Sequence, residues 1–318
     1  MIISQSLVEK LLQKDKRSVA RSISIIESEN TDSSELLKVI YHKVGNAYRI
    51  GITGPPGAGK STITNQLIKV FLNENKTVGV IAVDPTSPYT GGALLGDRVR
   101  MNEIGLNPGV FIRSMATRGS LGGLSKTAND AADIIDAAGY DYIIFETVGV
   151  GQSELDIAQA ADSTIVVLVP ESGDSVQAMK AGLMEIADFF VMNKSDRPGS
   201  EQAITSLKTI LMMKNYEDKL WFPTIIKATA VDNKGVEDIV NEIARHRKYL
   251  LDSGNFQKRR ENHFHMRIKE IVEDRIKKIL WSSEGQRKIH SSLDNLKISD
   301  ISPYKIADEI LDNFKKQL

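Results

Sequence analysis

Cysteine is absent from this 318-residue chain, and histidine is scarce, with five residues. The absence of cysteine excludes disulfides, thiolate catalysis and cysteine-ligated metal, and it is compatible with a reducing compartment. Basic and acidic residues balance at 41 each, so no net charge favours a nucleic acid or a membrane partner. The apolar runs, such as 165–170, are far too short to span a bilayer. Residues 1–6 lack a basic segment followed by an apolar core, so we expect no secretory signal and a cytoplasmic location.

The segment 51–62, GITGPPGAGKST, has the most specific pattern in the chain. Residues 54–61 fit G-x-x-x-x-G-K-[ST], the phosphate-binding P-loop, between an apolar run and a helical pattern. Its glycines let backbone N–H groups converge on a phosphate. The lysine supplies positive charge to the β- and γ-phosphates, and the serine hydroxyl can ligate Mg²⁺. We therefore predict a nucleoside triphosphate site formed by Gly54, Pro55, Pro56, Gly57, Ala58, Gly59, Lys60, Ser61 and Thr62.

A second motif, Asn-Lys-Ser-Asp at 193–196, follows the apolar run 189–192 and predicts that the base is guanine. The carboxylate of Asp196 can accept hydrogen bonds from both N1–H and the exocyclic amine, a paired contact that adenine cannot make. Lys194 would lie over the base, and Asn193 would brace neighbouring loops. A backbone contact to the guanine carbonyl is expected from the segment after the next strand, which comprises Ala228, Thr229 and Ala230.

Three carboxylates are placed to serve a magnesium ion beside Ser61: Asp84, Asp97 and Glu146. Because Mg²⁺ keeps several waters and takes one or two carboxylates, some of the three would act through water. Glu146 also begins the pattern Glu-Thr-Val-Gly, typical of a γ-phosphate sensor. The N–H of Gly149 would then bond the γ-phosphate and release it on hydrolysis.

The residue that orients the hydrolytic water is not evident. Val150 stands where Ras-type GTPases have glutamine, so either another group acts or hydrolysis is slow when the chain is alone. Gln152 and Lys180 are candidate catalytic residues, beside Lys60 and Glu146. Two further cations, Arg113 and Arg118, could reach the phosphates from loops.

The order of patterns predicts an α/β fold, a doubly wound and mainly parallel sheet with helical extensions at both ends. Short Val/Ile-rich runs alternate with helical patterns, which is typical of strands covered on both faces. The expected domains are a helical extension (1–45), a P-loop core (46–249) and a C-terminal helical segment (250–318). In the last, one face of a predicted helix over 255–280 is apolar, and it would pack on its own domain or on another subunit. The expected strands are 48–53, 78–83, 109–113, 142–146, 164–169, 188–192 and 223–227.

With these residues considered together, the chain resembles the MeaB/ArgK-type G-proteins, the GTPase chaperones of cobalamin-dependent acyl-CoA mutases. The run 146–154 is the most specific part of the resemblance, since a generic GTPase would not have it. Pro56 and the residues around 195–198 depart slightly from the family pattern, but no required functional group is lost. The matching segments are 51–62, 84–87, 96–98, 146–154, 193–194 and Asp196.

The resemblance implies a GTPase that uses Mg²⁺ with GTP or GDP and dimerises through its C-terminal arm. It implies association with methylmalonyl-CoA mutase or a related mutase, whose cofactor loading it gates and which it protects or reactivates. An adenosyltransferase is a further possible partner, and adenosylcobalamin would be held by the partners. The family also assigns Asp84, Asp97 and Glu146 to the magnesium site and 171–180 to a nucleotide-responsive switch.

A GTPase metallochaperone for nickel or cobalt is the alternative function. Such a protein would want a cysteine/histidine cluster, and this chain has no cysteine. His263 and His265 would point to different sides of a helix, which is typical of polar surface.

Overall fold

The computed structural model describes residues 4–28, 31–84, 102–116, 126–147, 153–170, 182–213, 221–281 and 302–315. Residues 1–260 form one compact unit, and residues 261–318 form a second.

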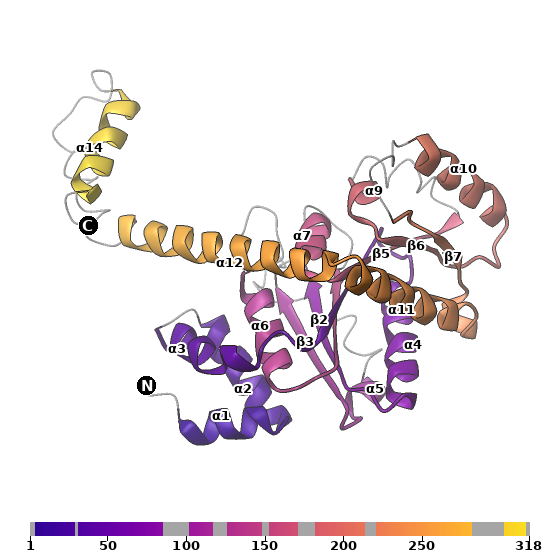
Figure 1. Ribbon diagram of the computed structural model, residues 1–318, viewed down its shortest axis with the longest axis horizontal. Helices are drawn as coiled ribbons and strands as arrows, with labels where there is room; N and C mark the ends of the chain where they lie inside the picture. Colours follow the sequence, from indigo (N-terminus) through magenta and orange to yellow (C-terminus); the bar gives the residue numbers. More distant parts are fainter. Residues whose placement is uncertain are drawn as a thin grey trace. The chain divides into compact units, whose positions relative to one another are not determined.

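The first unit contains a seven-stranded sheet in the order β3-β2-β4-β1-β5-β6-β7 (Figure 1). Every neighbouring pair is parallel, which confirms the predicted doubly wound sheet. The strands β4 and β5 are buried along nearly their whole length, as their continuous apolar runs predict. The strands are β1 (Tyr48–Thr53), β2 (Val78–Asp84), β3 (Val110–Ala116), β4 (Tyr142–Thr147), β5 (Ser163–Leu168), β6 (Phe189–Met192) and β7 (Ile225–Lys227).

All seven predicted strands are present, and only their ends differ. The last strand starts two residues later than predicted, at Ile225. Pro223 has no backbone N–H to give to a neighbouring strand, which limits its use in a sheet. The third strand runs three residues further than predicted, to Ala116, because its pairing with β2 continues to Asp84.

Helices cover both faces of the sheet. On one face, α4 and α11 pack against alternate strand residues such as Ile50 and Ile144. On the other face, α6 and α7 lie over the central strands and α9 and α10 over β5 and β6. The helices of this core are α4 (Lys60–Asn73), α5 (Asn102–Gly105), α6 (Lys126–Ala137), α7 (Ser153–Ala160), α9 (Leu183–Ile186), α10 (Ser200–Met213) and α11 (Val236–Asp252).

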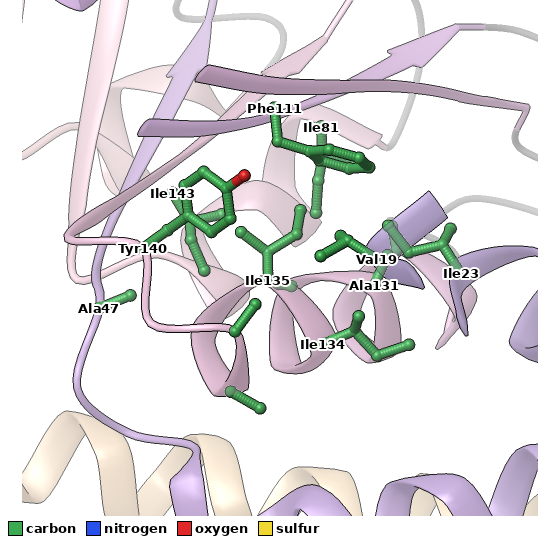
Figure 2. Close-up of a cluster of buried hydrophobic side chains, with 14 of the residues drawn as sticks. Val19, Ile23, Ala47, Ile81, Phe111, Ala131, Ile134, Ile135, Tyr140 and Ile143 are labelled. Atoms are coloured by element: carbon green, nitrogen blue, oxygen red, sulfur yellow. The ribbon is translucent and has the colours of Figure 1, made fainter. Parts of the chain in front are cut away.

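The N-terminal helices share the core of the sheet. Val19 and Ile23 of α2 belong to the same buried cluster as Ile134 of α6 and Phe111 of β3 (Figure 2). The carboxylate of Asp15 caps α2 by accepting from the backbone N–H of Ser18. The extension predicted at 1–45 therefore completes one face of the core. It comprises α1 (Gln5–Leu12), α2 (Lys16–Glu27), α3 (Thr31–Ile40) and the 3₁₀ turn η1 (Tyr41–Lys43).

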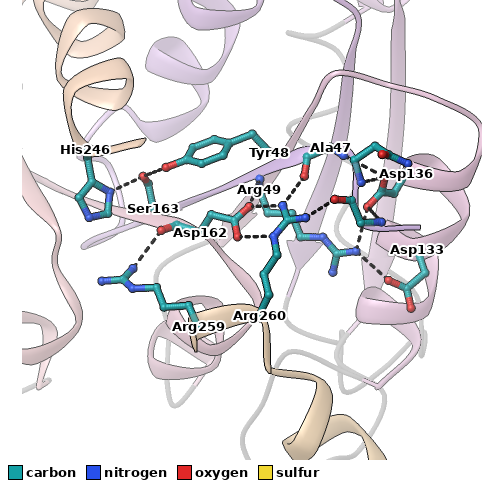
Figure 3. A network of polar contacts seen from close by, with 12 residues as sticks. Ala47, Tyr48, Arg49, Asp133, Asp136, Asp162, Ser163, His246, Arg259 and Arg260 are labelled. Carbon is teal, nitrogen blue, oxygen red and sulfur yellow. Dashed lines mark hydrogen bonds and ion pairs between the residues drawn. The ribbon is translucent and has the colours of Figure 1, made fainter. Parts of the chain in front are cut away.

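The first turns of α12 (Asn255–Leu280) are fixed to the amino ends of the strands. Nη2 of Arg259 lies 2.7 Å from Oδ1 of Asp188, the residue before β6. Nη2 of Arg260 lies 2.9 Å from Oδ2 of Asp162, the residue before β5 (Figure 3). The first unit thus continues past the predicted boundary at 250, because these cations neutralise two buried carboxylates of the core.

Among the described residues, the second unit comprises α12 from Glu261 onward and the whole of α14 (Pro303–Lys315). Proline is the first residue of α14, where its missing N–H costs no hydrogen bond. The apolar face predicted for α12 is solvent-exposed in this single chain, with Phe264, Ile268, Val272, Ile276 and Ile279 each between 43% and 58% accessible. None of the helices in the described ranges is both long and apolar enough to span a membrane.

Candidate functional site

The P-loop connects the carboxyl end of β1 to the first residue of α4. Gly54 has φ +135° and Gly59 has φ +89°, values that L side chains rarely adopt. A Cβ on Gly54 would lie 2.1 Å from the carbonyl oxygen of Val167, in β5. The glycines at these two positions are therefore required by the backbone of the loop and by the close approach of the neighbouring strand.

The side chain of Lys60 lies against the loop that precedes it. Its Nζ is 2.8 Å from the carbonyl oxygen of Gly54 and 3.0 Å from that of Pro55. The residue is 6% exposed, so the ammonium charge is held among backbone dipoles rather than in bulk water. This arrangement keeps a cation inside a loop whose geometry suits an anionic ligand.

Ser61 and Glu146 meet at the carboxyl edge of the sheet. Oγ of Ser61 donates a hydrogen bond to Oε1 of Glu146, which is buried. Glu146 is in register with Ile52 of β1 and Ala82 of β2, so it lies between the strands that lead to the P-loop and to Asp84. A hydroxyl and a carboxylate beside the P-loop are the oxygen donors that Mg²⁺ prefers, so the residues present fit the ion.

Asn193 joins the P-loop to two other loops. Its Nδ2 donates to the carbonyl oxygen of Ala58 over 2.8 Å, and its Oδ1 accepts from the N–H of Ala230 over 3.1 Å. Its own N–H donates to the carbonyl oxygen of Leu168. The side chain is buried, and its amide fits directly above Gly59, where a Cβ would lie 2.3 Å from Nδ2. The motif after β6 and the P-loop therefore form one packed unit.

Asp196 is exposed at the same edge and is oriented by Thr229. Oγ1 of Thr229 lies 3.3 Å from Oδ1 of Asp196 and 3.4 Å from Oγ of Ser195. The N–H of Ser195 donates to the carbonyl of Ala228. Lys194, which directly precedes Ser195, has φ +55°, and the chain turns sharply there after β6. The carboxylate predicted to bind guanine is thus accessible and held by the loop after β7.

The backbone donors of the loop after β7 are mostly in use. The N–H groups of Ala228, Thr229 and Ala230 donate to Met192 O, Lys234 O and Asn193 Oδ1 respectively. Among the described parts of the chain, the N–H of Val231 has no acceptor. The backbone contact to guanine predicted for residues 228–230 would therefore require one of their existing bonds to open.

Several predicted site residues lie outside the described residues. These are Gly149, Gln152, Lys180, Asp97 and Arg118. Asp84 is the last residue of β2 and adjoins the strand of Glu146, but only its backbone is described. Arg113 is in β3 rather than in a loop, and it pairs with Glu27 and Ser24 of α2. That ion pair directs the guanidinium to the N-terminal helices, so the expectation that Arg113 reaches the phosphates is corrected.

Sequence reasoning missed Gln66, whose Nε2 donates to the carbonyl of Ala230 over 3.0 Å. No motif includes this residue, and it contacts a loop more than 160 positions away in the chain. Only its place on the helix that follows the P-loop could have suggested a role.

A serine, a histidine and an aspartate also align at the opposite edge of the sheet. Oγ of Ser163 lies 2.6 Å from Nδ1 of His246 (Figure 3). Nε2 of His246 lies 3.3 Å from Oδ1 of Asp188. Ser163 is fully buried and also hydrogen-bonded to the hydroxyl of Tyr48. Because no substrate could reach this serine, the network stabilises the fold and is not a hydrolytic triad.

Comparisons with known proteins find similar proteins over most of the length of the chain. The family model of the methylmalonyl Co-A mutase-associated GTPase MeaB matches residues 19–285. A putative GTPase of Pyrococcus abyssi is 46% identical over 307 residues, which cover 96% of this chain and 95% of that protein. The GTPase ArgK of Escherichia coli is 33% identical over 306 residues, covering 93% and 92%. The solved structure of an LAO/AO transport system kinase superposes with a TM-score of 0.73 at 27% identity, over 99% of this chain and 100% of that one.

Proposed function

Because this chain belongs to the MeaB family of methylmalonyl Co-A mutase-associated GTPases, we propose that it is a GTP-hydrolysing chaperone of an adenosylcobalamin-dependent acyl-CoA mutase. The proposed binding of GTP is supported chiefly by one observation. The hydrogen bonds of Asn193 hold its own motif, the P-loop and the loop after β7 together. Phosphate-binding and base-binding groups thereby face the same edge of one sheet, as doubly wound folds place their ligands. Membership of the MeaB family supports the proposed association with a mutase.

In this proposal the P-loop N–H groups and Lys60 hold the phosphates, and Asp196 binds the guanine edge. P-loop GTPases generally use Mg²⁺ with the nucleotide, and here Ser61 and Glu146 would hold it, with Asp84 and Asp97 contributing directly or through water. The bound ion supplies charge neutralisation at the β- and γ-phosphates.

The γ-phosphate would be sensed by the N–H of Gly149, and Gln152 or Lys180 would orient the attacking water. Because valine follows that glycine, we propose that hydrolysis is slow when the chain is alone and is modulated by the partner.

The proposed client is methylmalonyl-CoA mutase or a related acyl-CoA mutase. The nucleotide state would gate the loading of adenosylcobalamin and the protection or reactivation of the enzyme. The cofactor itself would be bound by the mutase and by an adenosyltransferase. The chain has balanced charge, so this association would depend on local surfaces rather than on long-range attraction.

We further propose that a second copy of this chain covers the apolar face of α12. The face has five side chains at spacings of three or four residues, which align on one side of a helix. Each is about half exposed in a single chain, and an aligned apolar face of this kind is stable when buried against another helix. A homodimer would bury the same face of both copies.

The experiment is a nucleotide-dependent binding measurement. The purified chain is mixed with an adenosylcobalamin-dependent mutase in the presence of GDP or a non-hydrolysable GTP analogue, and complex formation is followed by light scattering after gel filtration. We expect the affinity to differ between the two nucleotides. If the chain binds GTP but no complex forms with either nucleotide, the mutase assignment is overturned and the GTPase assignment stands.

A further inference from the structure

The carbonyl group of Ala230 is held by a side chain from a different part of the fold. Nε2 of Gln66 donates to this oxygen over 3.0 Å, in a partly buried contact. Gln66 belongs to α4, the helix that begins at Lys60 of the P-loop. The bond therefore connects the helix that carries the phosphate-binding residues to the loop beside Asp196.

Fixing this carbonyl also fixes the direction of the next N–H. No described peptide bond is cis, and in a planar trans peptide the C=O and N–H point in opposite directions. The C=O of Ala230 and the N–H of Val231 belong to one peptide group. The N–H of Asn233 also donates to this oxygen, over 3.3 Å, so Gln66 and Asn233 together orient the N–H of Val231, which has no acceptor within the described part of the protein.

The N–H groups of residues 228–230 and 232–234 are already occupied, and the loop also orients the carboxylate. Ala230 gives its N–H to Asn193, while Thr229 contacts Asp196 through Oγ1. A carboxylate that accepts from N1–H and the amine of guanine leaves the neighbouring carbonyl, O6, in need of a donor. An N–H of fixed direction with no protein acceptor meets that need, because an unsatisfied polar atom would otherwise weaken binding.

We propose that Gln66 is a positioning residue for guanine selectivity, which holds the Ala230–Val231 peptide so that the N–H of Val231 meets O6 of the base. The inference rests on the proposed assignment of Asp196 to the guanine edge. Gln66 does not touch the nucleotide itself. Its amide acts through the peptide group, in the same way that Thr229 acts through the carboxylate.

The test compares nucleotides that differ at single positions of the base. The variant Gln66→Met keeps the length of the side chain and removes the donor, and Lys69→Met, at an exposed position of α4, is the matched control. Dissociation constants are measured by calorimetry for GDP, for 6-thio-GDP, whose sulfur is a weak acceptor, and for IDP, which lacks the amine.

We expect Gln66→Met to raise the dissociation constant of GDP by about 2- to 13-fold, the usual effect of one hydrogen bond. The constant for 6-thio-GDP should rise less, so that the preference for GDP over 6-thio-GDP shrinks while the preference for GDP over IDP is retained. Equal losses for GDP and 6-thio-GDP, or no loss for either, would overturn the role of Gln66.

A failure of the guanine assignment of Asp196 would give a different result from a failure of the role proposed for Gln66. If the unchanged chain bound ADP as tightly as GDP, the guanine site itself would be refuted. If Asp196→Asn reduced the preference for GDP over IDP while Gln66→Met left all ratios unchanged, only the inference about Gln66 would fail.

Discussion

At the scale of single residues, the proposed guanine selectivity rests on the carboxylate of Asp196. The substitution Asp196→Asn replaces one acceptor oxygen by an amide donor while the side chain keeps its size. We expect the affinity for GTP to fall about 100-fold or more, because two charge-assisted hydrogen bonds are lost. Affinity for xanthosine triphosphate should rise, since its second carbonyl can accept from the new amide. Competition binding against a fluorescent nucleotide measures both, and unchanged selectivity would refute the assignment of Asp196.

The buried carboxylate of Asp188 predicts how stability changes with acid. Burial tends to raise its pKa, but hydrogen bonds and charge from His246 and Arg259 outweigh burial and lower the pKa from 3.8 to about 2. A carboxyl group with a depressed folded pKa adds stability above its unfolded pKa and loses it as the pH falls toward the folded value. The stabilisation, about 2 kcal/mol, is therefore present above about pH 4 and disappears toward pH 2.

This expectation is checked by urea unfolding of Asp188→Asn between pH 6 and pH 2. The variant should be less stable than the unchanged chain at pH 6, and the difference should narrow below pH 4. Asp252→Asn, at an exposed carboxylate, is the control and should show no such narrowing. A constant difference across the range would mean that Asp188 is not held in its charged form by its partners.

At the scale of elements, the P-loop requires glycine at Gly54 for two separate reasons. A side chain there would adopt a positive φ and would also meet the backbone oxygen of Val167 at 2.1 Å. Gly57 has φ +76°, but no atom of the described residues lies within 4 Å of an added Cβ, so Gly57→Ala is a matched control. We expect Gly57→Ala to cost about 1–2 kcal/mol from backbone strain alone, and Gly54→Ala to cost more. Urea unfolding without nucleotide measures both, and equal losses would contradict the close contact with β5.

The apolar face of α12 predicts the oligomeric state. Replacing Ile268 and Ile276 by lysine would place two charges on the proposed contact between two copies. We expect light scattering to show a dimer for the unchanged chain and a monomer for this variant, with GTP affinity retained. Replacing Lys269 and Lys277 by alanine is the control. A monomeric unchanged chain would contradict the proposed dimer.

Elements with strong local patterns were predictable from the sequence. Most of the seven strands are continuous apolar runs, and α12 was expected over residues 255–280 because its apolar spacing is regular from Phe264 to Ile279. Strand order and the packing of α2 against α6 depend on contacts distant in sequence, which periodicity does not specify. For the same reason Arg113 was misjudged: its ion pair with Glu27 depends on where the N-terminal helices dock.

At the scale of the whole molecule, the resemblance to the MeaB/ArgK-type G-proteins is confirmed by the family match. The motifs of the site were visible because each is contiguous in sequence. The bracing role of Asn193 was predicted from its motif, but its hydrogen-bond partners were not. The hydrogen bond of Gln66 was not predicted at all, since it connects segments that lie far apart in the chain. The functional groups of this site can therefore be identified from sequence motifs, whereas the hydrogen bonds that hold the motifs together can be identified only from the fold.

The central claim concerns a nucleotide-driven chaperone, and it is tested most directly by GTP turnover. Phosphate release is measured for the chain alone, with an adenosylcobalamin-dependent acyl-CoA mutase, and for Lys60→Ala with the same mutase. Lys60→Ala should fail to bind or to hydrolyse GTP, because the substitution removes the ammonium group that lies within the P-loop. We predict slow turnover alone and a clear acceleration with the mutase. Turnover that is the same with and without the mutase, for a chain that hydrolyses GTP, would contradict the account.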